Sequence, residues 1–337
     1  MFGFVRVGVY VCVRSCVCRM ENSYPLIIVN PDLATRLTGV GRSGWVVAYW
    51  LLGSLVALAF GLAVYHFSGS WYRCVWGVGA VLSNFACMPL LHVFVGRKIP
   101  LGLAVVYFFR GAVLAVVSAV VLELLEAVNL GPHGHFFVWP LAVTAGFAEE
   151  VAKLGSVLVG LCLFSNRLPE TLVIPHVFCW RIPAGPCVRF WSVYIETPRA
   201  LAFAGIAAGY GFMMTENLEY FFKPVAQAPG MVATVVLIIR TLLNLHPLLT
   251  GLSATRLANR VWDENCCVRT DPLSIGNILN AIWPSVCIHA MYDFGLMLTL
   301  SDPTDRNLVA AMVCVSLLLI PTSAILLTCA YRRLPHK

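Results

Sequence analysis

Charged residues are scarce in this sequence. Asp, Glu, Lys and Arg make up 12% of its 337 residues, whereas 59% are hydrophobic and the mean hydropathy is +0.82. Soluble domains average about 25% charged residues, roughly twice this share. The composition therefore excludes an ordinary soluble globule and predicts a polytopic membrane protein.

Several chemical signatures are also missing. The sequence has no H-E-x-x-H zincin helix, no G-x-S-x-G elbow, no C-x-x-C pair with zinc-ligand spacing and no internal repeat. Its formal net charge of +7 is not arranged as a basic stripe interleaved with aromatic residues, so we expect no nucleic-acid partner. The 13 cysteines lie on predicted cytosolic segments or at spans, where a disulfide framework is not expected.

Long apolar stretches are the main feature that the sequence does have. A helix needs about 20 predominantly apolar residues to cross about 30 Å of hydrocarbon. Eight stretches qualify, near residues 45–65, 73–95, 101–122, 137–164, 200–222, 230–254, 275–299 and 307–330. We therefore expect an all-α fold, a polytopic membrane helix bundle of about eight transmembrane helices.

The positive charges give this bundle an orientation. With both termini in the cytosol, 17 of the 23 Lys and Arg residues lie on the cytosolic side and three on the opposite side, as the positive-inside rule requires. The Pro- and aromatic-rich segment 165–199 is then cytosolic and suited to lying on the lipid headgroups. Four parts are predicted: a cytosolic segment 1–44, three spans in 45–136, a four-span core 137–300, and a final span with a basic cytosolic tail 301–337.

The fourth span carries three charges in a single turn, although a charge at the bilayer centre costs roughly 2.5–3.5 kcal/mol. Lys153 lies four residues after Glu149 and three after Glu150, so it can neutralise one of these acids on a helix. Two neighbouring acids in a low dielectric titrate at separate pH values, which provides a proton acceptor and a proton donor. The alternative is a structural ion pair between helices.

The fifth span combines small residues with polar ones. Gly205 and Gly209 form a small-xxx-small face that permits close helix packing. Glu216 and Tyr220 lie one turn apart, and Asn217 is next to them. An acid, an amide and a phenol can therefore be presented together to a neighbouring helix.

The sixth and seventh spans supply histidines. His246 precedes Pro247 and follows Arg240 by six residues; a lone histidine before a proline is more often a packing residue than a ligand. His289 and Asp293 lie one turn apart. An aspartate that accepts from one imidazole nitrogen fixes the tautomer and leaves the other nitrogen free for a metal or a water.

Taken together, these spacings resemble the PrsW family of intramembrane proteases, distant relatives of the CAAX prenyl proteases. The resemblance covers roughly residues 137–300. It rests on E-E-x-x-K at 149–153, G-F at 211–212 followed by E-N-x-x-Y at 216–220, His246, and H-x-x-x-D at 289–293, in this order. CAAX prenyl proteases more typically show E-E-x-x-x-R, and because position 154 is Leu, that narrower activity is not expected.

The resemblance implies hydrolysis of a peptide bond in a membrane-embedded or single-span protein substrate. The candidate catalytic residues are Glu149, Glu150, Lys153, Glu216, Asn217, His246, His289 and Asp293. A glutamate would deprotonate a water held near His289, the second acid would protonate the leaving amine, and Asn217, Tyr220 or Arg240 would stabilise the oxyanion.

Metal dependence stays open at this point. Glu149, Glu216, His246 and His289 are candidate ligands for Zn²⁺, but a glutamate can also activate water without a metal. Counting about 1.5 Å per residue along the predicted spans, Glu149 and His289 match best in depth. His246 is the deepest and the least certain ligand.

Other functions are compatible with the same residues. A proton- or cation-coupled transporter would use the buried charges as a relay, although transporters often contain internal repeats. A catalytically inactive scaffold would not need every motif residue, and all of them are present. A metal-dependent amidase acting on membrane lipids is also chemically open.

Overall fold

The computed structural model describes a helical bundle preceded by a short hairpin. The described residues are 9–13, 16–20, 42–68, 71–94, 99, 101–130, 138–164, 197–222, 239–240, 245–261, 274–301 and 305–334. Most of the predicted cytosolic segments 1–44 and 165–199 lies outside them. The hairpin pairs β1 (Val9–Val13) with β2 (Cys16–Met20) in antiparallel fashion.

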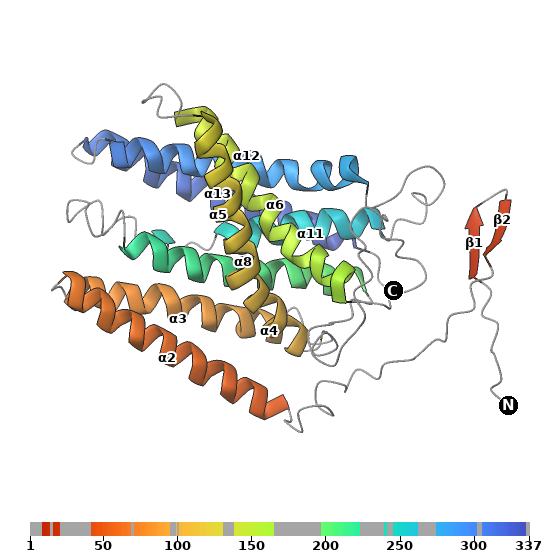
Figure 1. The fold of residues 1–337 in the computed structure, drawn as a ribbon, viewed down its shortest axis with the longest axis horizontal. Coiled ribbons are helices and arrows are strands. Elements are labelled where there is room, and N and C mark those ends of the chain that lie inside the picture. Colours follow the sequence, from red (N-terminus) through yellow and green to blue (C-terminus); the bar gives the residue numbers. More distant parts are fainter. Residues whose placement is uncertain are drawn as a thin grey trace.

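The helices confirm the predicted all-α bundle, and Figure 1 shows α5 and α6 crossing the other helices obliquely. The third predicted span is a continuous helical segment formed by α4, η1 and α5. The helices are α2 (Arg42–Ser68), α3 (Trp71–Phe94), α4 (Leu101–Arg110), the π-helix η1 (Gly111–Ala115), α5 (Val116–Leu130), α6 (Val138–Phe164), α8 (Pro198–Phe222), α11 (Leu245–Val261), α12 (Ile275–Ser301) and α13 (Arg306–Arg332).

Four stretches in the described part are long and apolar enough to cross a membrane: Cys74–Val93, Gly102–Leu122, Ile275–Thr299 and Arg306–Arg332. Helices α6 and α8 contain 27 and 25 residues, about 40 Å at 1.5 Å per residue, and they carry the charged motifs. The total of eight spans stays a prediction.

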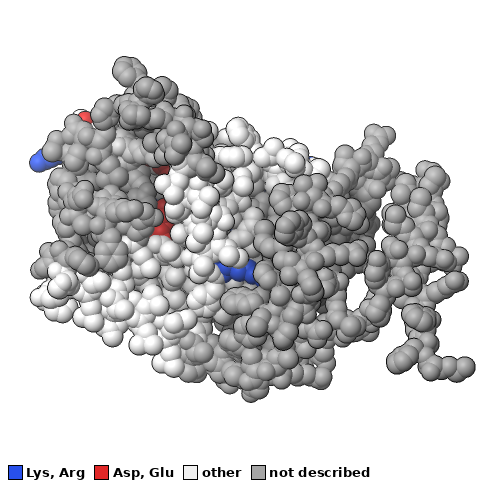
Figure 2. Space-filling model, viewed as in Figure 1, with Lys and Arg blue, Asp and Glu red and all other residues white. Residues whose placement is uncertain are grey.

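Many apolar side chains are exposed on the part of the bundle that the structure describes. Leu55, Leu58 and Leu62 of α2 and Leu318 and Ile325 of α13 are exposed, and Figure 2 shows few charged groups among the described residues of one face. Soluble monomers rarely expose large contiguous apolar patches. The surface therefore suits contact with lipid, as expected for a multi-pass membrane protein.

Helix α11 (Leu245–Val261) overlaps the C-terminal part of the predicted sixth span, 230–254, and continues seven residues beyond it, past Arg256 and Arg260. Its polar residues bond to α12: Ser253 Oγ donates to Ser285 Oγ at 2.8 Å, and Arg260 Nη1 donates to Asn277 Oδ1 at 2.8 Å. Polar residues lower the hydropathy of a stretch and so weaken the prediction of a span. Here they form hydrogen bonds between two helices.

The small-residue face predicted on α8 is confirmed, because both of its glycines face α11. A Cβ atom at Gly209 would lie 2.7 Å from the His246 carbonyl oxygen and 2.6 Å from the Pro247 Cα atom, and Gly205 lies against Thr250 and Ala254. A proline is tolerated in the first turn of a helix. Gly209 thus allows the first turn of α11, with His246, to pack against α8.

Replacing Gly209 with alanine should destabilise the protein, because the atoms that the new methyl group meets are backbone atoms that cannot turn away. Overpacking of this kind costs about 1–3 kcal/mol. Thermal unfolding of the purified protein in detergent would measure the loss. Gly155→Ala on α6 is the matched control, since no atom lies within 4 Å of a Cβ at that position; equal unfolding temperatures for the two variants would contradict the prediction.

Candidate active site

Four helices bring the predicted site residues to one centre. Each of these residues is at most 9% exposed. Helix α6 supplies Glu149, Glu150 and Lys153, α8 supplies Glu216 and Asn217, α11 supplies His246, and α12 supplies His289 and Asp293. The side chain of Tyr220, predicted as an oxyanion donor, lies outside the described residues.

Lys153 lies at the middle of this cluster. Its Nζ atom is 2.7 Å from Glu150 Oε1 and 3.2 Å from Glu149 Oε2, and it donates to His246 Nδ1 at 2.9 Å. It also lies 4.4 Å from the centroid of the Phe212 ring. The lysine therefore contacts both acids rather than neutralising only one, and it links α6 to α11 and α8.

Glu150 sets the orientation of His289. Its Oε1 atom is 3.1 Å from His289 Nδ1. An ionised carboxylate can only accept a hydrogen bond, so Nδ1 carries a proton, and in the neutral imidazole Nε2 presents a lone pair. Among the described residues Nε2 has no hydrogen-bond partner, but it lies 3.4 Å from Glu149 Oε2 and 3.5 Å from Asp293 Oδ2. Glu150 thus takes the orienting position that the sequence predicts for Asp293.

Glu216 plays the same part for His246. Its Oε2 atom lies 2.5 Å from His246 Nε2 and 2.6 Å from Arg240 Nη2, while Arg240 Nε donates to Asn217 Oδ1 at 2.8 Å. His246 Nδ1 therefore carries the lone pair, 3.9 Å from Glu149 Oε2. His246 is a central member of the cluster because its helix begins at Leu245; the predicted depth assumed a span from residue 230.

Three residues fit a metal ion. Glu149, His246 and His289 each offer one ligand atom, and these atoms all lie within 4.8 Å of one another. Tetrahedral zinc ligands about 2.1 Å from the ion are about 3.4 Å apart, close to the observed 3.4 and 3.9 Å from Glu149 Oε2 to the two histidines. A carboxylate on the outer nitrogen of a ligating histidine is the usual arrangement. Glu216, predicted as a ligand, stands outside this group.

The charge balance of the cluster points the same way. Its described side chains include four carboxylates but only two permanent cations, Lys153 and Arg240. With all four carboxylates ionised and both histidines neutral, the cluster would carry two negative charges in excess. Buried charges without a counterpart cost several kcal/mol each, and one divalent cation would neutralise both.

One side of the cluster is open and the other is closed. The side chains of Glu149, Glu216 and Asp293 each retain 11% exposure, whereas those of Glu150, Lys153 and His289 have none. Acidic atoms are visible from outside on one face of the bundle (Figure 2). Glu149 therefore lies on the partly exposed side of the cluster, and Glu150 on the buried side.

Comparison with known proteins gives one clear result. A family model described as PrsW family intramembrane metalloprotease matches residues 99–320. The chain belongs to this family. The resemblance that the motifs indicate is thereby confirmed, and the matched region begins before residue 137, so it includes α4, η1 and α5 as well as the four helices of the site. No curated protein and no solved structure matched the chain.

In this PrsW-family site, Phe212 is a residue whose role the sequence motifs do not reveal. Its ring lies under Lys153 Nζ and 5.3 Å from the centroid of the His246 ring. Its position near the site can be inferred from the sequence spacing, because Phe212 is four residues before Glu216 and therefore lies on the same face of α8. The PrsW G-F motif thus places an aromatic surface beneath the charged cluster.

Proposed function

We propose that this PrsW-family protein cleaves a peptide bond of a membrane-embedded or single-span protein substrate at the centre formed by Glu149, His246 and His289. One observation carries the proposal: each histidine has one ring nitrogen on a carboxylate, His289 Nδ1 on Glu150 and His246 Nε2 on Glu216. The other ring nitrogen of each histidine faces Glu149. This arrangement fixes two tautomers at once, which suits a site that holds a water for hydrolysis.

Glu149 is the proposed general base. Its Oε2 atom is near His289 Nε2 and His246 Nδ1, on the open side of the cluster. It accepts a proton from the attacking water as the new carbon–oxygen bond forms, and the proton then passes to the leaving amine as the carbon–nitrogen bond breaks. Asn217 Nδ2 is buried and has no hydrogen-bond partner among the described residues, so it is the proposed donor to the oxyanion. Arg240 holds Asn217 by its carbonyl oxygen.

The same residues also suit a metal-bound form of the site, in which Glu149, His246 and His289 would hold the ion, with Zn²⁺ as the candidate, and Glu149 would be a ligand rather than the general base. The ion would supply a bound water acidic enough to give hydroxide at neutral pH and would polarise the substrate carbonyl. The excess of carboxylates over permanent cations in the cluster supports a divalent ion. Because Lys153 donates to His246 Nδ1, a metal on this nitrogen would replace that hydrogen bond.

The test is cleavage by the purified protein in lipid vesicles. A panel of single-span proteins would be incubated with it, and mass spectrometry would locate any cut. A cut inside the membrane segment that the double variant Glu149→Gln/His289→Ala does not make would support the proposal. Proton or cation flux in the same vesicles without any cleavage would instead favour the transporter alternative.

We also propose that both termini and the segment 165–199 face the cytosol, as the charge distribution indicates. A glycosylation-site scan would test this orientation. No glycan should be accepted near residue 180, because the glycosylation machinery acts on the opposite side of the membrane. A glycan at that position would overturn the orientation and the eight-span arrangement together.

A further inference from the structure

The third span carries no acid or histidine of the candidate site, yet it packs directly behind the site. Its two α-helical halves, α4 and α5, are joined by the π-helix η1. Such π-turns are rare and are frequently found at functional sites. The family match begins at residue 99 and therefore includes this whole span, although the recognisable motifs begin only at Glu149.

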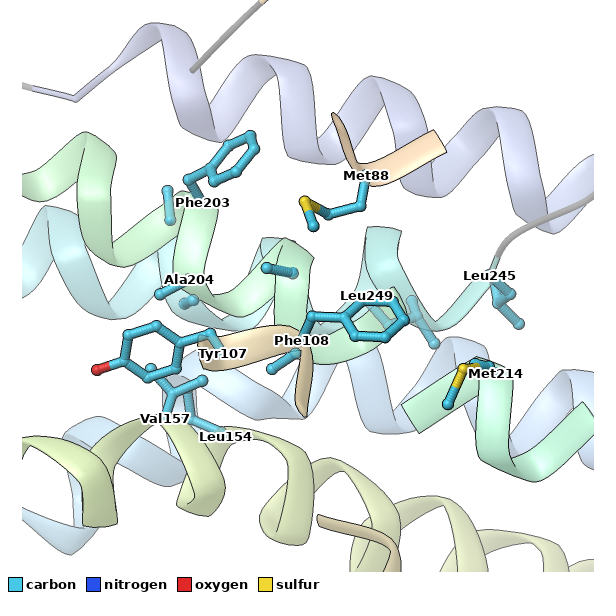
Figure 3. Close-up of a cluster of buried hydrophobic side chains, with 14 of the residues drawn as sticks. Met88, Tyr107, Phe108, Leu154, Val157, Phe203, Ala204, Met214, Leu245 and Leu249 are labelled. Atoms are coloured by element: carbon cyan, nitrogen blue, oxygen red, sulfur yellow. The ribbon is translucent and has the colours of Figure 1, made fainter. Parts of the chain in front are cut away.

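The span contacts α8 backbone to backbone. A Cβ atom at Gly211 of α8 would overlap the Phe108 carbonyl oxygen, and one at Gly111 of η1 would overlap that of Ala208. Figure 3 shows Tyr107 and Phe108 in the same buried cluster as Ala204 of α8 and Leu154 of α6. The two helices are thus held at a fixed distance.

A side-chain hydrogen bond crosses this contact at η1. In a regular α-helix the Val116 N–H would donate to Ala112 O, but here it donates to Val113 O. Thr215 Oγ1 of α8 donates to Ala112 O instead, at 2.9 Å, while the carbonyl of Gly211 in its own helix is 3.4 Å away. The Ala112 carbonyl therefore accepts a donor from α8 at the place where the regular bond from the Val116 N–H is missing.

Thr215 immediately precedes the carboxylate that holds a site histidine. Glu216 Oε2 lies 2.5 Å from His246 Nε2, so a rotation of α8 about its axis would move this oxygen away from the ring. A second contact runs through Phe212, which packs on Ala115 of η1 and Ala152 of α6 and lies under Lys153. Both contacts link η1 to the charged cluster.

We propose that η1 is a positioning element of the active site, acting through the hydrogen bond from Thr215 to Ala112 O to hold Glu216 against His246. Thr215 is a positioning residue and does not touch the substrate. This inference rests on the function proposed above, because it assigns Thr215 a role in setting the geometry of that site.

The test compares Thr215→Val, which keeps the shape but removes the donor, with Thr215→Ser, which keeps the donor. Two properties of the purified protein are measured: Zn²⁺ binding, as a dissociation constant from competition with a chelating indicator, and cleavage, as kcat and KM. Loss of a group that orients a ligand typically weakens metal binding by about 10–100-fold. We expect Thr215→Val to weaken Zn²⁺ binding at least about 10-fold and to lower kcat similarly at unchanged KM, and Thr215→Ser to restore both.

Thr322→Val is the matched control, because Thr322 lies on α13 and its hydroxyl donates to the carbonyl of Leu318 in its own helix; this variant should leave Zn²⁺ binding and cleavage unchanged. If the wild-type protein cleaves or binds Zn²⁺ and Thr215→Val matches it, the positioning role is wrong while the proposed function stands. Failure of Thr215→Ser to restore the loss would also overturn the role. A wild-type protein that neither cleaves nor binds Zn²⁺ would refute the proposed function, and this inference with it.

Discussion

Glu149→Gln should reduce cleavage at least about 100-fold, the usual scale for the loss of a general acid–base group. The amide keeps the size of the side chain but cannot accept the proton of the attacking water, and its neutral oxygen is a weaker ligand at the candidate metal site. Glu149 is the acid on the open side of the cluster, with its Oε2 atom 3.4 Å from His289 Nε2. Initial rates in vesicles, with folding verified by thermal unfolding, would measure the effect.

Glu150→Gln is the informative comparison for this prediction. The sequence motif assigns both acids the same importance, but Glu150 is fully buried between Lys153 and His289. It orients the ring, and the amide oxygen of glutamine can still accept from Nδ1, so the loss should be about 10-fold, smaller than for Glu149. A variant that loses more activity at Glu150 than at Glu149 would show that the two roles are exchanged. Normal cleavage by both variants would make the carboxylates structural.

His289→Ala and His246→Ala should each abolish activity and remove the bound metal. Each substitution takes away one of three ligand atoms, and a site with two remaining ligands binds a divalent ion poorly. Elemental analysis of the purified variants together with rates of cleavage would test both outcomes. We expect equal effects for the two histidines, because each has one ring nitrogen on a carboxylate: His246 on Glu216 and His289 on Glu150.

Asp293→Asn should weaken metal binding and activity less than either histidine variant. Asp293 lies 3.5 Å from His289 Nε2, outside the group of three ligands, and the orienting contact to this ring comes from Glu150. Titration of the wild-type protein with a chelator gives the decisive control. Full cleavage by metal-free protein would leave the mechanism in which Glu149 activates water alone.

Hydropathy predicted most helices closely because lipid-facing surfaces require apolar residues. The stretches 137–164 and 275–299 correspond to α6 (Val138–Phe164) and α12 (Ile275–Ser301). Helix α11 continues beyond the predicted stretch 230–254, and its polar residues, such as Ser253, are buried against a neighbouring helix. Hydropathy carries no information on which neighbour satisfies a polar group.

The residues of the candidate site could be predicted for a related reason. Ionisable residues are costly in the middle of a span, so each one is conspicuous in the sequence. Their pairing was not predictable: Glu150 rather than Asp293 orients His289, and Glu216 holds His246. Such pairings depend on how helices rotate against each other over separations such as the 139 residues between Glu150 and His289, which local spacing cannot give.

The buried charges of α6 have a consequence for biogenesis. Ribosomes deliver α6 to the membrane before α11 and α12 exist, so at that moment Glu149 and Glu150 have only Lys153 from the same helix as a charged partner, and the contacts with His246 and His289 come later. Insertion of α6 into the hydrocarbon core would therefore be unfavourable at this stage of synthesis. In a nascent chain that stalls before α12, α6 should remain weakly inserted and accessible to membrane quality control. Synthesis of α12 should stabilise the inserted helix.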